Sequence, residues 1–320
     1  MTFHPDTLPN LRGKVFIVTG GNSGIGYYTV VRLAEHGAHV YMCARSLDKG
    51  TVAIAEIKKM YPLANIDLLQ MDLMDLSSVV AAAERFLALE TTLHGLVNNA
   101  GIMATPFEIT KDGHEAQWQT NYLAHWVLTT HLLPLMLRTA KALPPGDVRI
   151  VNLTSSGHLG APKTGINFAD LSLKDSGPWS RYGQSKLANI LHTKTLHKAY
   201  GPGSRSARDR NGEIWVSSVH PGLVDTGLAT SVTESGSSLT SVFAVLRMCG
   251  FFLSADKGSW TSLFCAASRD MKAEQSGAYL EIFGRFGEPT WQSGAAKDEK
   301  LAERLEVWTG EVMKKGGWVR

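Results

Sequence analysis

A tyrosine and a lysine stand four residues apart in the segment RYGQSKLANILHTKTLHKAY. Tyr182 and Lys186 would share one face of a helix, because residues i and i+4 are neighbours there. A free tyrosine titrates near pH 10, so acid–base work near neutrality requires its pKa to fall by roughly 3 units, about 4 kcal/mol. One cation at about 4 Å, at an effective dielectric of about 20, supplies an interaction of that order. The pair is either a catalytic acid–base group with its tuning cation or a surface pair without function.

A glycine-rich stretch, TGGNSGIG at 19–26, lies between an apolar run and a helical pattern. Gly20 would allow a sharp turn, Gly24 would let a ligand approach the backbone, and Gly26 would permit close helix–sheet contact. The free amides of a helix N-terminus attract a pyrophosphate. The alternative is a plain turn, which the position between a first strand and a first helix disfavours. The stretch therefore predicts a dinucleotide site.

These groups need a scaffold, and the chain alternates short apolar runs with longer helical patterns. Strands are predicted at 14–19, 38–44, 65–73, 94–101, 148–156, 213–222 and 277–283. Strands separated by helices pair in parallel through right-handed crossovers. We therefore predict an α/β fold, a Rossmann-type doubly wound parallel sheet of about seven strands with helices on both faces.

No linker, repeat or change of composition divides the chain, so residues 1–320 are predicted to form a single domain. A long helical pattern runs from 113 to 139 and is interrupted by Pro134. Its half-buried stripe consists of His114, Trp118, Asn121, His125, Leu128 and Leu132. A C-terminal helix is predicted at about 297–315, with an apolar face formed by Leu301, Leu305, Trp308 and Val312.

The composition excludes several classes of protein. The chain is 44% apolar and 19% charged, with a net charge of +3 and a pI of about 8.7. Without runs of lysine or arginine, this balance does not indicate binding to nucleic acid. The eleven histidines show no metal-ligand spacing. Cys43, Cys249 and Cys265 are interpreted as small buried hydrophobic residues, so no metal site is expected.

No segment predicts a membrane span or an export signal. The N-terminus lacks the basic start, apolar run and cleavage site of a signal peptide. A span needs roughly 18 apolar residues. The apolar segment 241–253 is shorter than that and contains Arg247. The chain is therefore expected to be a cytoplasmic protein.

The glycine spacing T-G-x-x-x-G-x-G resembles that of the short-chain dehydrogenase/reductase family, and further motifs agree along nearly the whole chain, from about Gly13 to Gly284. They are NNAG at 98–101, Asp72 in MDL, the Y-x-x-x-K of YGQSK, and the P-G turn of HPGLVDT. The segments SKLANIL and SVHPG are most similar to the retinol-dehydrogenase-like branch. Two features of the pattern are absent: the membrane anchor common in that branch, and a close match for residues 228–255.

The resemblance implies a role for each catalytic residue. Tyr182 would be the proton donor or acceptor, while Lys186 would lower its pKa and hold the nicotinamide ribose. Ser155, with Ser156 as the alternative, would bind and polarise the substrate oxygen. Asn121 would support a water-linked proton path to the lysine. Apart from the resemblance, the missing side chain of Gly183 leads to the hypothesis that substrate or cofactor passes close to the tyrosine there.

The resemblance also implies a cofactor site. Its residues are Gly20, Asn22, Ser23, Gly24, Ile25, Gly26, Arg45, Asp72, Leu73, Asn98, Ala100, Gly101, Tyr182, Lys186, Pro221, Gly222, Val224 and Thr226. In dinucleotide folds an acid at the end of the second strand selects NAD. Arg45 stands near that place, and its planar fork can pair with a 2′-phosphate, with added charge from Lys49. The cofactor is predicted to be NADP(H), with NAD as the alternative.

Substrate contacts in such folds come from loops beyond the carboxyl ends of the strands. The segment 228–255 is the candidate lid, and with Met103, Leu159 and Trp179 it predicts a bulky hydrophobic ketone, aldehyde or alcohol. His220 is interpreted as a structural residue at a strand end. The leading hypothesis is a carbonyl reductase or alcohol dehydrogenase.

Two other functions stay open: a nucleotide-binding regulatory protein, and a non-redox enzyme on the same fold. The partner is expected to be a small hydrophobic molecule. In this family the two long helices often pair, which would give a homodimer.

Overall fold

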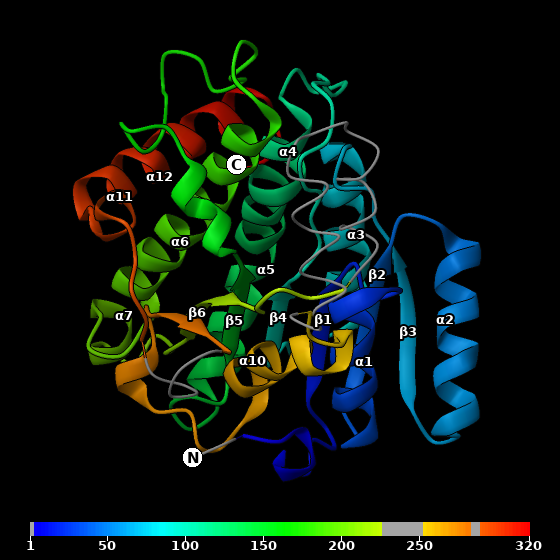
Figure 1. Cartoon of the computed structure of the whole chain (residues 1–320). Coiled ribbons are helices and arrows are strands. Elements are labelled where there is room, and N and C mark those ends of the chain that lie inside the picture. Colours follow the sequence, from blue (N-terminus) through cyan, green and yellow to red (C-terminus); the bar gives the residue numbers. More distant parts are fainter. Residues whose placement is uncertain (1–2, 226–251, 283–288) are drawn as a thin grey trace.

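The computed structural model describes residues 3–225, 252–282 and 289–320. Seven parallel strands form one sheet in the order β3-β2-β1-β4-β5-β6-β7 (Figure 1). Their bounds are β1 Val15–Thr19, β2 His39–Ala44, β3 Asn65–Gln70, β4 Gly95–Asn98, β5 Arg149–Leu153, β6 Trp215–His220 and β7 Tyr279–Glu281. The order reverses between β1 and β4, as in a doubly wound fold. The predicted Rossmann-type fold is confirmed.

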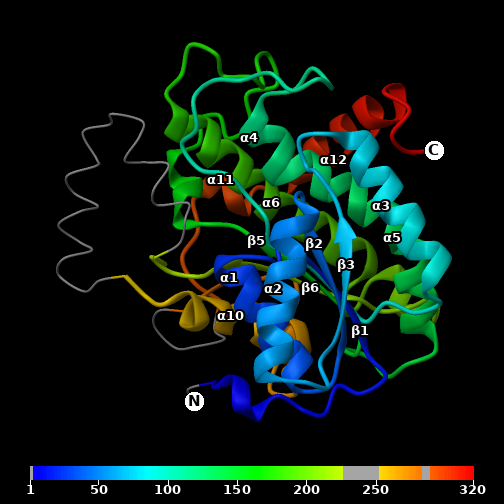
Figure 2. The same ribbon diagram turned by 90° about the vertical axis from the view of Figure 1, so that its right-hand side faces the viewer.

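Helices cover both faces of the sheet (Figure 2). One layer consists of α1 Gly24–Glu35, α2 Leu47–Met60 and α10 Ala255–Ala267, and the other of α3 Leu76–Leu89, α5 Ala124–Lys141 and α6 Pro178–Tyr200. Successive strand residues point to opposite faces. Phe16 and Val18 therefore pack under the first layer, while Val15 and Ile17 pack under the second.

The remaining elements are short, apart from one. They are η1 Pro5–Thr7, α4 Ala116–Trp118, the π-helical turn η2 Gln119–Leu123, η3 Ser156–Gly160, α7 Arg205–Arg208, η4 Ala273–Gln275, α11 Gly294–Lys297 and α12 Glu299–Lys315. The last two account for the predicted C-terminal helix. Helix α7 lies in the polar stretch 201–212.

The long helix predicted at 113–139 is three consecutive pieces: α4, the π-helical turn and α5. Pro134 lies inside α5 without ending it. A proline removes one backbone hydrogen bond from a helix. Here Leu132, Leu135 and Met136 around it are fully buried in the core, and this burial outweighs that loss.

Helix α12 packs along α6 and reaches α5 (Figure 1). The carboxylate of Glu306 accepts hydrogen bonds from Trp126 Nε1 at 2.9 Å and Thr195 Oγ1 at 3.0 Å, and it contacts His192 Nδ1 at 3.0 Å. The Trp118 and Trp126 side chains are buried, as expected of core residues.

The structure also bears on the expectations for the cysteines, for a membrane span and for a metal site. Cys43 and Cys265 are free and buried, whereas Cys249 lies outside the described residues. Within the described part of the chain, no helix is long and apolar enough to span a membrane. Among the same residues, no group of three or more His, Cys, Asp and Glu side chains could hold a metal ion.

Candidate active site

Thr19 ties the ends of β1 and β4 together at the carboxyl edge of the sheet. Its Oγ1 accepts hydrogen bonds from the amides of Asn99 and Ala100, both at 2.9 Å. The Asn99 side chain returns a bond to the carbonyl of Thr19 at 2.8 Å. The NNAG turn is therefore locked against the start of the phosphate loop. Sequence reasoning missed Thr19 and Asn99, although both lie within the motifs it quoted.

The phosphate loop fits a dinucleotide. Gly20 and Gly24 have φ of +63° and +56°, a backbone region that favours glycine. A Cβ on Gly26 would collide with the carbonyl oxygen of Gly20, so the loop folds tightly only because that side chain is absent. Ser23 makes no side-chain cap bond, which leaves the first amides of α1 available to a phosphate. Asn22 is half-buried in this loop.

The residues predicted to lie near the adenine of the cofactor differ in their exposure and in their hydrogen bonds. Asp72 is half-buried, and its Oδ1 accepts from the amide of Met74 at 3.0 Å. Leu73 is buried. Arg45 is exposed directly after β2, and its guanidinium makes no ion pair with any residue in the described ranges. Lys49 is exposed in the first turn of α2.

The side chain of Asn98 makes hydrogen bonds within the core and is not directed at a ligand site. Its Nδ2 donates to Asn152 Oδ1 at 2.8 Å and Thr129 Oγ1 at 3.1 Å, and all three residues are buried. Gly101 follows in the turn, and a Cβ there would lie 3.0 Å from Asn121 Oδ1 and 3.2 Å from Lys186 Nζ. The turn therefore approaches helix α6 closely.

Tyr182 and Lys186 lie on one face of α6, as predicted, and both are buried. Lys186 Nζ sits 5.7 Å from the centre of the tyrosine ring and donates to the carbonyl of Leu153 at 3.2 Å. The same carbonyl accepts from Asn189 Nδ2 at 2.9 Å. The ammonium group is thus fixed beside the phenol by the end of β5.

Burial shifts the pKa values of Tyr182 and Lys186 in opposite directions, and in each case it favours the neutral form of the group. It raises the pKa of Tyr182 to about 12, and a hydrogen bond with Ser155 offsets part of that rise. Burial lowers the pKa of Lys186 to about 8. In this chain by itself the phenol therefore stays protonated at neutral pH, whereas the sequence-based argument had the lysine lowering its pKa.

Ser155 stands at the end of the β5 segment and caps η3. Its Oγ accepts from the amide of Gly157 at 3.0 Å, which fixes the hydroxyl beside Tyr182. A Cβ on Gly157 would lie 2.6 Å from the tyrosine ring, so this glycine makes the room that the ring occupies. Gly157 was missed because nothing in the local sequence marks the contact. Ser156, the alternative serine, is the first residue of η3.

Gly183 does something other than predicted. A Cβ there would lie 2.6 Å from the backbone of Gly160 and Ala161 and 2.8 Å from the carbonyl oxygen of Gly157. The missing side chain lets α6 pack against the backbone of η3, and it does not open a passage for substrate or cofactor. The prediction for Gly183 was wrong because the neighbour comes from another segment.

Asn121 lies in the π-helical turn and is fully buried, not half-buried as its stripe suggested. Its Oδ1 accepts from the amide of Ile102 at 2.8 Å, and its Nδ2 donates to Ser185 Oγ at 2.9 Å. The side chain therefore joins the NNAG turn to α6. Its carbonyl oxygen contacts His125 Nδ1 at 3.1 Å.

A cavity of about 190 Å³ opens beside Tyr182. Its polar wall contains Ser155, Ser156, Tyr182 and His220, and its apolar wall contains Ile25, Met103, Trp179, Leu223, Val224 and Phe252. Pro221 and Gly222 complete the side next to β6. Leu159 does not line it and is 52% exposed, so that expected substrate contact was wrong. Thr226 and most of the candidate lid 228–255 lie outside the described residues.

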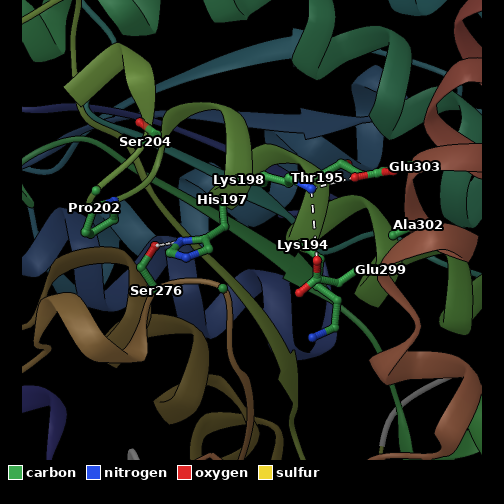
Figure 3. A pocket seen from close by; sticks show the side chains of 12 residues that line it. Lys194, Thr195, His197, Lys198, Pro202, Ser204, Ser276, Glu299, Ala302 and Glu303 are labelled. Carbon is green, nitrogen blue, oxygen red and sulfur yellow. Dashed lines mark hydrogen bonds and ion pairs between the residues drawn. The ribbon is translucent and has the colours of Figure 1, made fainter. Parts of the chain in front are cut away.

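A second cavity, of about 400 Å³, lies near the C-terminal end of α6 (Figure 3). In it Lys198 pairs with Glu303 at 2.5 Å and Glu299 at 4.0 Å, and His197 Nδ1 contacts Ser276 Oγ at 3.0 Å (Figure 3). Lys198 is about 24 Å along the helix from Tyr182 at 1.5 Å per residue. The larger cavity is therefore separate from the catalytic groups.

The parallel sheet and the glycine-rich loop fit a dinucleotide-binding protein, and comparisons with known proteins show its family. The family model for short chain dehydrogenase matches residues 14–236. The chain is 50% identical to the short-chain dehydrogenase/reductase drtF of Aspergillus calidoustus, with 97% of each chain covered. It is 37% identical to retinol dehydrogenase 12 of Mus musculus, covering 92% of this chain and 84% of that one.

Solved structures share the fold. An uncharacterized protein from Mycobacterium paratuberculosis superposes with a TM-score of 0.72 at 30% identity, covering 98% of both chains. An NADPH-bound carbonyl reductase from chicken fatty liver gives a TM-score of 0.62 at 22% identity, covering 90% of this chain and 97% of that one. The chain belongs to the short-chain dehydrogenase/reductase family and is similar to its retinol dehydrogenases. It is therefore an oxidoreductase of a family that binds nicotinamide cofactors.

Proposed function

We propose that the chain is an NADP(H)-dependent carbonyl reductase or alcohol dehydrogenase that interconverts a hydrophobic ketone or aldehyde and its alcohol. One observation carries the proposal: Ser155 and Tyr182 form the polar wall of a cavity whose other wall is apolar. A carbonyl oxygen directed at the two hydroxyls would place its apolar substituents against Met103, Trp179 and Phe252.

Tyr182, Ser155 and Lys186 have separate roles in the proposed reduction. NADPH, when bound, supplies the hydride to the carbonyl carbon. Tyr182 donates its phenolic proton to the carbonyl oxygen, since burial keeps the phenol protonated at neutral pH. Ser155 donates a second hydrogen bond to that oxygen and holds the substrate in register. Lys186 stabilises the phenolate that remains, because its ammonium group is fixed 5.7 Å from the ring centre.

Arg45 supports the choice of NADP(H). It is exposed directly after the second strand and has no anionic partner among the described residues. A 2′-phosphate would provide that partner through a bidentate, charge-assisted pair. The Arg45→Asp variant should lose NADPH-dependent turnover by at least about tenfold while NADH-dependent turnover is maintained. Lys58→Ala, an exposed cation at the other end of α2, is the matched control.

Oxidation of NADPH and of NADH against a panel of hydrophobic ketones and aldehydes tests the function. We expect turnover with NADPH, and a loss of about a thousandfold or more in Tyr182→Phe, which retains the ring without the proton. Tyr200→Phe, at the end of the same helix, should behave like the parent. A parent-like rate in Tyr182→Phe would refute the mechanism, and better turnover with NADH would refute the role of Arg45.

A further inference from the structure

His220 is a buried polar side chain of the candidate substrate cavity, and its Nδ1 has no partner among the described residues. It is the last residue of β6, is 5% exposed, and lines the cavity with Ser155 and Tyr182. The same Nδ1 atom is buried away from water. Native proteins rarely leave a buried imidazole in this state.

The polar groups around His220 already have partners. His158 is close enough to His220 to lower its pKa, but His158 Nδ1 donates to the carbonyl of Ser155 at 2.8 Å. The second ring nitrogen of His158 accepts from the amide of Ser293 at 3.5 Å. Tyr279, whose ring lies 5.3 Å from that of His158, donates its hydroxyl proton to Glu281 at 2.6 Å. None of these groups donates a hydrogen bond to His220 or accepts one from it.

The state of the ring limits what His220 can bind. Burial lowers its pKa to about 4, with a smaller contribution from His158, so the ring is neutral at pH 7. A neutral imidazole has one N–H donor and one acceptor nitrogen. Since Nδ1 is sealed, Nε2 is the nitrogen left to a ligand in the cavity. A neutral oxygen group is the matching partner, because an unpaired anion would lack a countercharge there.

We propose that His220 hydrogen-bonds a second oxygen of the substrate, placed next to the reacting carbonyl. The preferred substrates would then be apolar ketones that carry an adjacent hydroxyl or oxo group. The inference rests on the proposed function, which directs the reacting carbonyl at Ser155 and Tyr182. Ser155, Tyr182 and His220 line the same cavity of about 190 Å³, so one small ligand could contact all three.

Two other partners for His220 lead to different results. A group of the bound cofactor would make the effect of a His220 variant independent of the substrate. A water molecule would leave substrate binding unchanged. The substrate proposal alone predicts that the effect depends on the second oxygen, so a pair of ligands that differ in that oxygen separates the three cases.

Acetylbenzoyl and propiophenone are such a pair, since they share one carbon skeleton and propiophenone lacks the second oxygen. Their dissociation constants are measured by calorimetry on the enzyme saturated with NADP⁺, which cannot reduce them. In the parent we expect acetylbenzoyl to bind about five- to tenfold tighter, the range for one hydrogen bond. The preference should vanish in His220→Phe and return in His220→Gln, whose amide can occupy the place of Nε2.

Ser217→Ala is the matched control, because Ser217 is a buried polar residue of the same strand that does not line the cavity. It should keep the parent's preference. An equal affinity for the two ligands in the parent, an unchanged preference in His220→Phe, or an equal weakening of both ligands would overturn the proposal. Because binding is read without turnover, a failure of the proposed function would appear separately, in the Tyr182→Phe kinetics.

Discussion

At the scale of single residues, Lys186, for which we propose a catalytic role, is a group whose burial opposes folding. Lys186 is 5% exposed, and burial lowers its pKa from 10.5 to about 8. Lys186 pairs with no carboxylate among the described residues, and a buried ammonium group without such a partner carries a free-energy penalty. The shift in pKa corresponds to a penalty of about 3 kcal/mol. This value is an upper bound on the net penalty, because the hydrogen bond from Nζ to the carbonyl of Leu153 offsets part of it. The proposed function, and not stability, would account for this residue.

The variant Lys186→Met should therefore lose turnover without losing stability. The folded chain has the lower pKa, so the penalty is complete below about pH 8 and disappears as pH rises through 10.5, where the unfolded lysine also loses its proton. We expect the free energy of unfolding of the variant to equal or exceed that of the parent at pH 7, with the difference shrinking toward pH 10. Urea titrations at pH 7, 8.5 and 10 measure it. A variant clearly less stable at pH 7 would contradict the argument.

Gly183 permits a different prediction, because its contact is steric. A side chain there meets the backbone of Gly160 and Ala161, which cannot move aside as a flexible side chain would. We expect Gly183→Ala to lower the free energy of unfolding by about 1–3 kcal/mol. It should also reduce turnover, since η3 begins at the residue after Ser155.

The control for Gly183 is Gly177→Ala at the start of the same helix. Gly177 has a negative φ, and a Cβ there would meet nothing within 4 Å. This variant should resemble the parent in both stability and turnover. Thermal unfolding and steady-state kinetics of the two variants decide the matter. Parent-like stability in Gly183→Ala would mean that α6 and η3 can separate without cost.

At the scale of elements, His125 connects α5 to the cofactor edge of the sheet. Thr19 Oγ1 already accepts from two amides, so its proton points to His125 Nε2 at 2.9 Å. His125 Nδ1 must then carry the ring proton and donate to the carbonyl of Asn121 at 3.1 Å. Burial, which lowers the pKa of His125 to about 4, keeps this neutral form. One ring thus joins the phosphate loop to the π-helical turn.

The variant His125→Leu should destabilise the protein by about 1–3 kcal/mol, because it removes the short contact of the Thr19 hydroxyl with Nε2 and the side-chain contact to the Asn121 carbonyl, both in the core. It should also raise the KM for the cofactor more than the KM for the substrate. Thr130→Val removes only a bond to the carbonyl of Trp126 within α5, so it serves as the comparison. Equal stability of the two variants would show that the bridge is dispensable.

These contacts mark the limit of sequence reasoning. Strand periodicity and the glycine spacing are local signals, and they were sufficient to predict the sheet and the phosphate loop. Ser155 was added to Tyr182 and Lys186 through the family resemblance. The π-helical turn at Asn121 and the packing of Gly183 depend on segments far apart in sequence. Leu159 was misplaced for the same reason, since helical spacing cannot tell which face of η3 meets the cavity.

At the scale of the whole molecule, α12 covers the surface of α5 and α6 through which the sequence analysis expected two subunits to pair. The family resemblance suggested a homodimer through two long helices, here α5 and α6. Helix α12 of the same chain packs on α6, and its Glu306 and Thr309 bond to Trp126 and Tyr122 in the α5 layer. Beyond α12, the carbonyl of Trp318 contacts His131 Nε2 at 2.7 Å.

We therefore expect a monomer with the mass of one chain, 34.8 kDa. A dimer through α5 and α6 would have to displace α12 and expose Leu305 and Met313, which are buried, and the hydrophobic cost of that exposure is several kcal/mol. Light scattering after gel filtration measures the mass. The variant Leu305→Asp, which should loosen α12, would reveal whether the covered face associates once it is exposed. A parent protein of twice the chain mass would show that another surface mediates pairing.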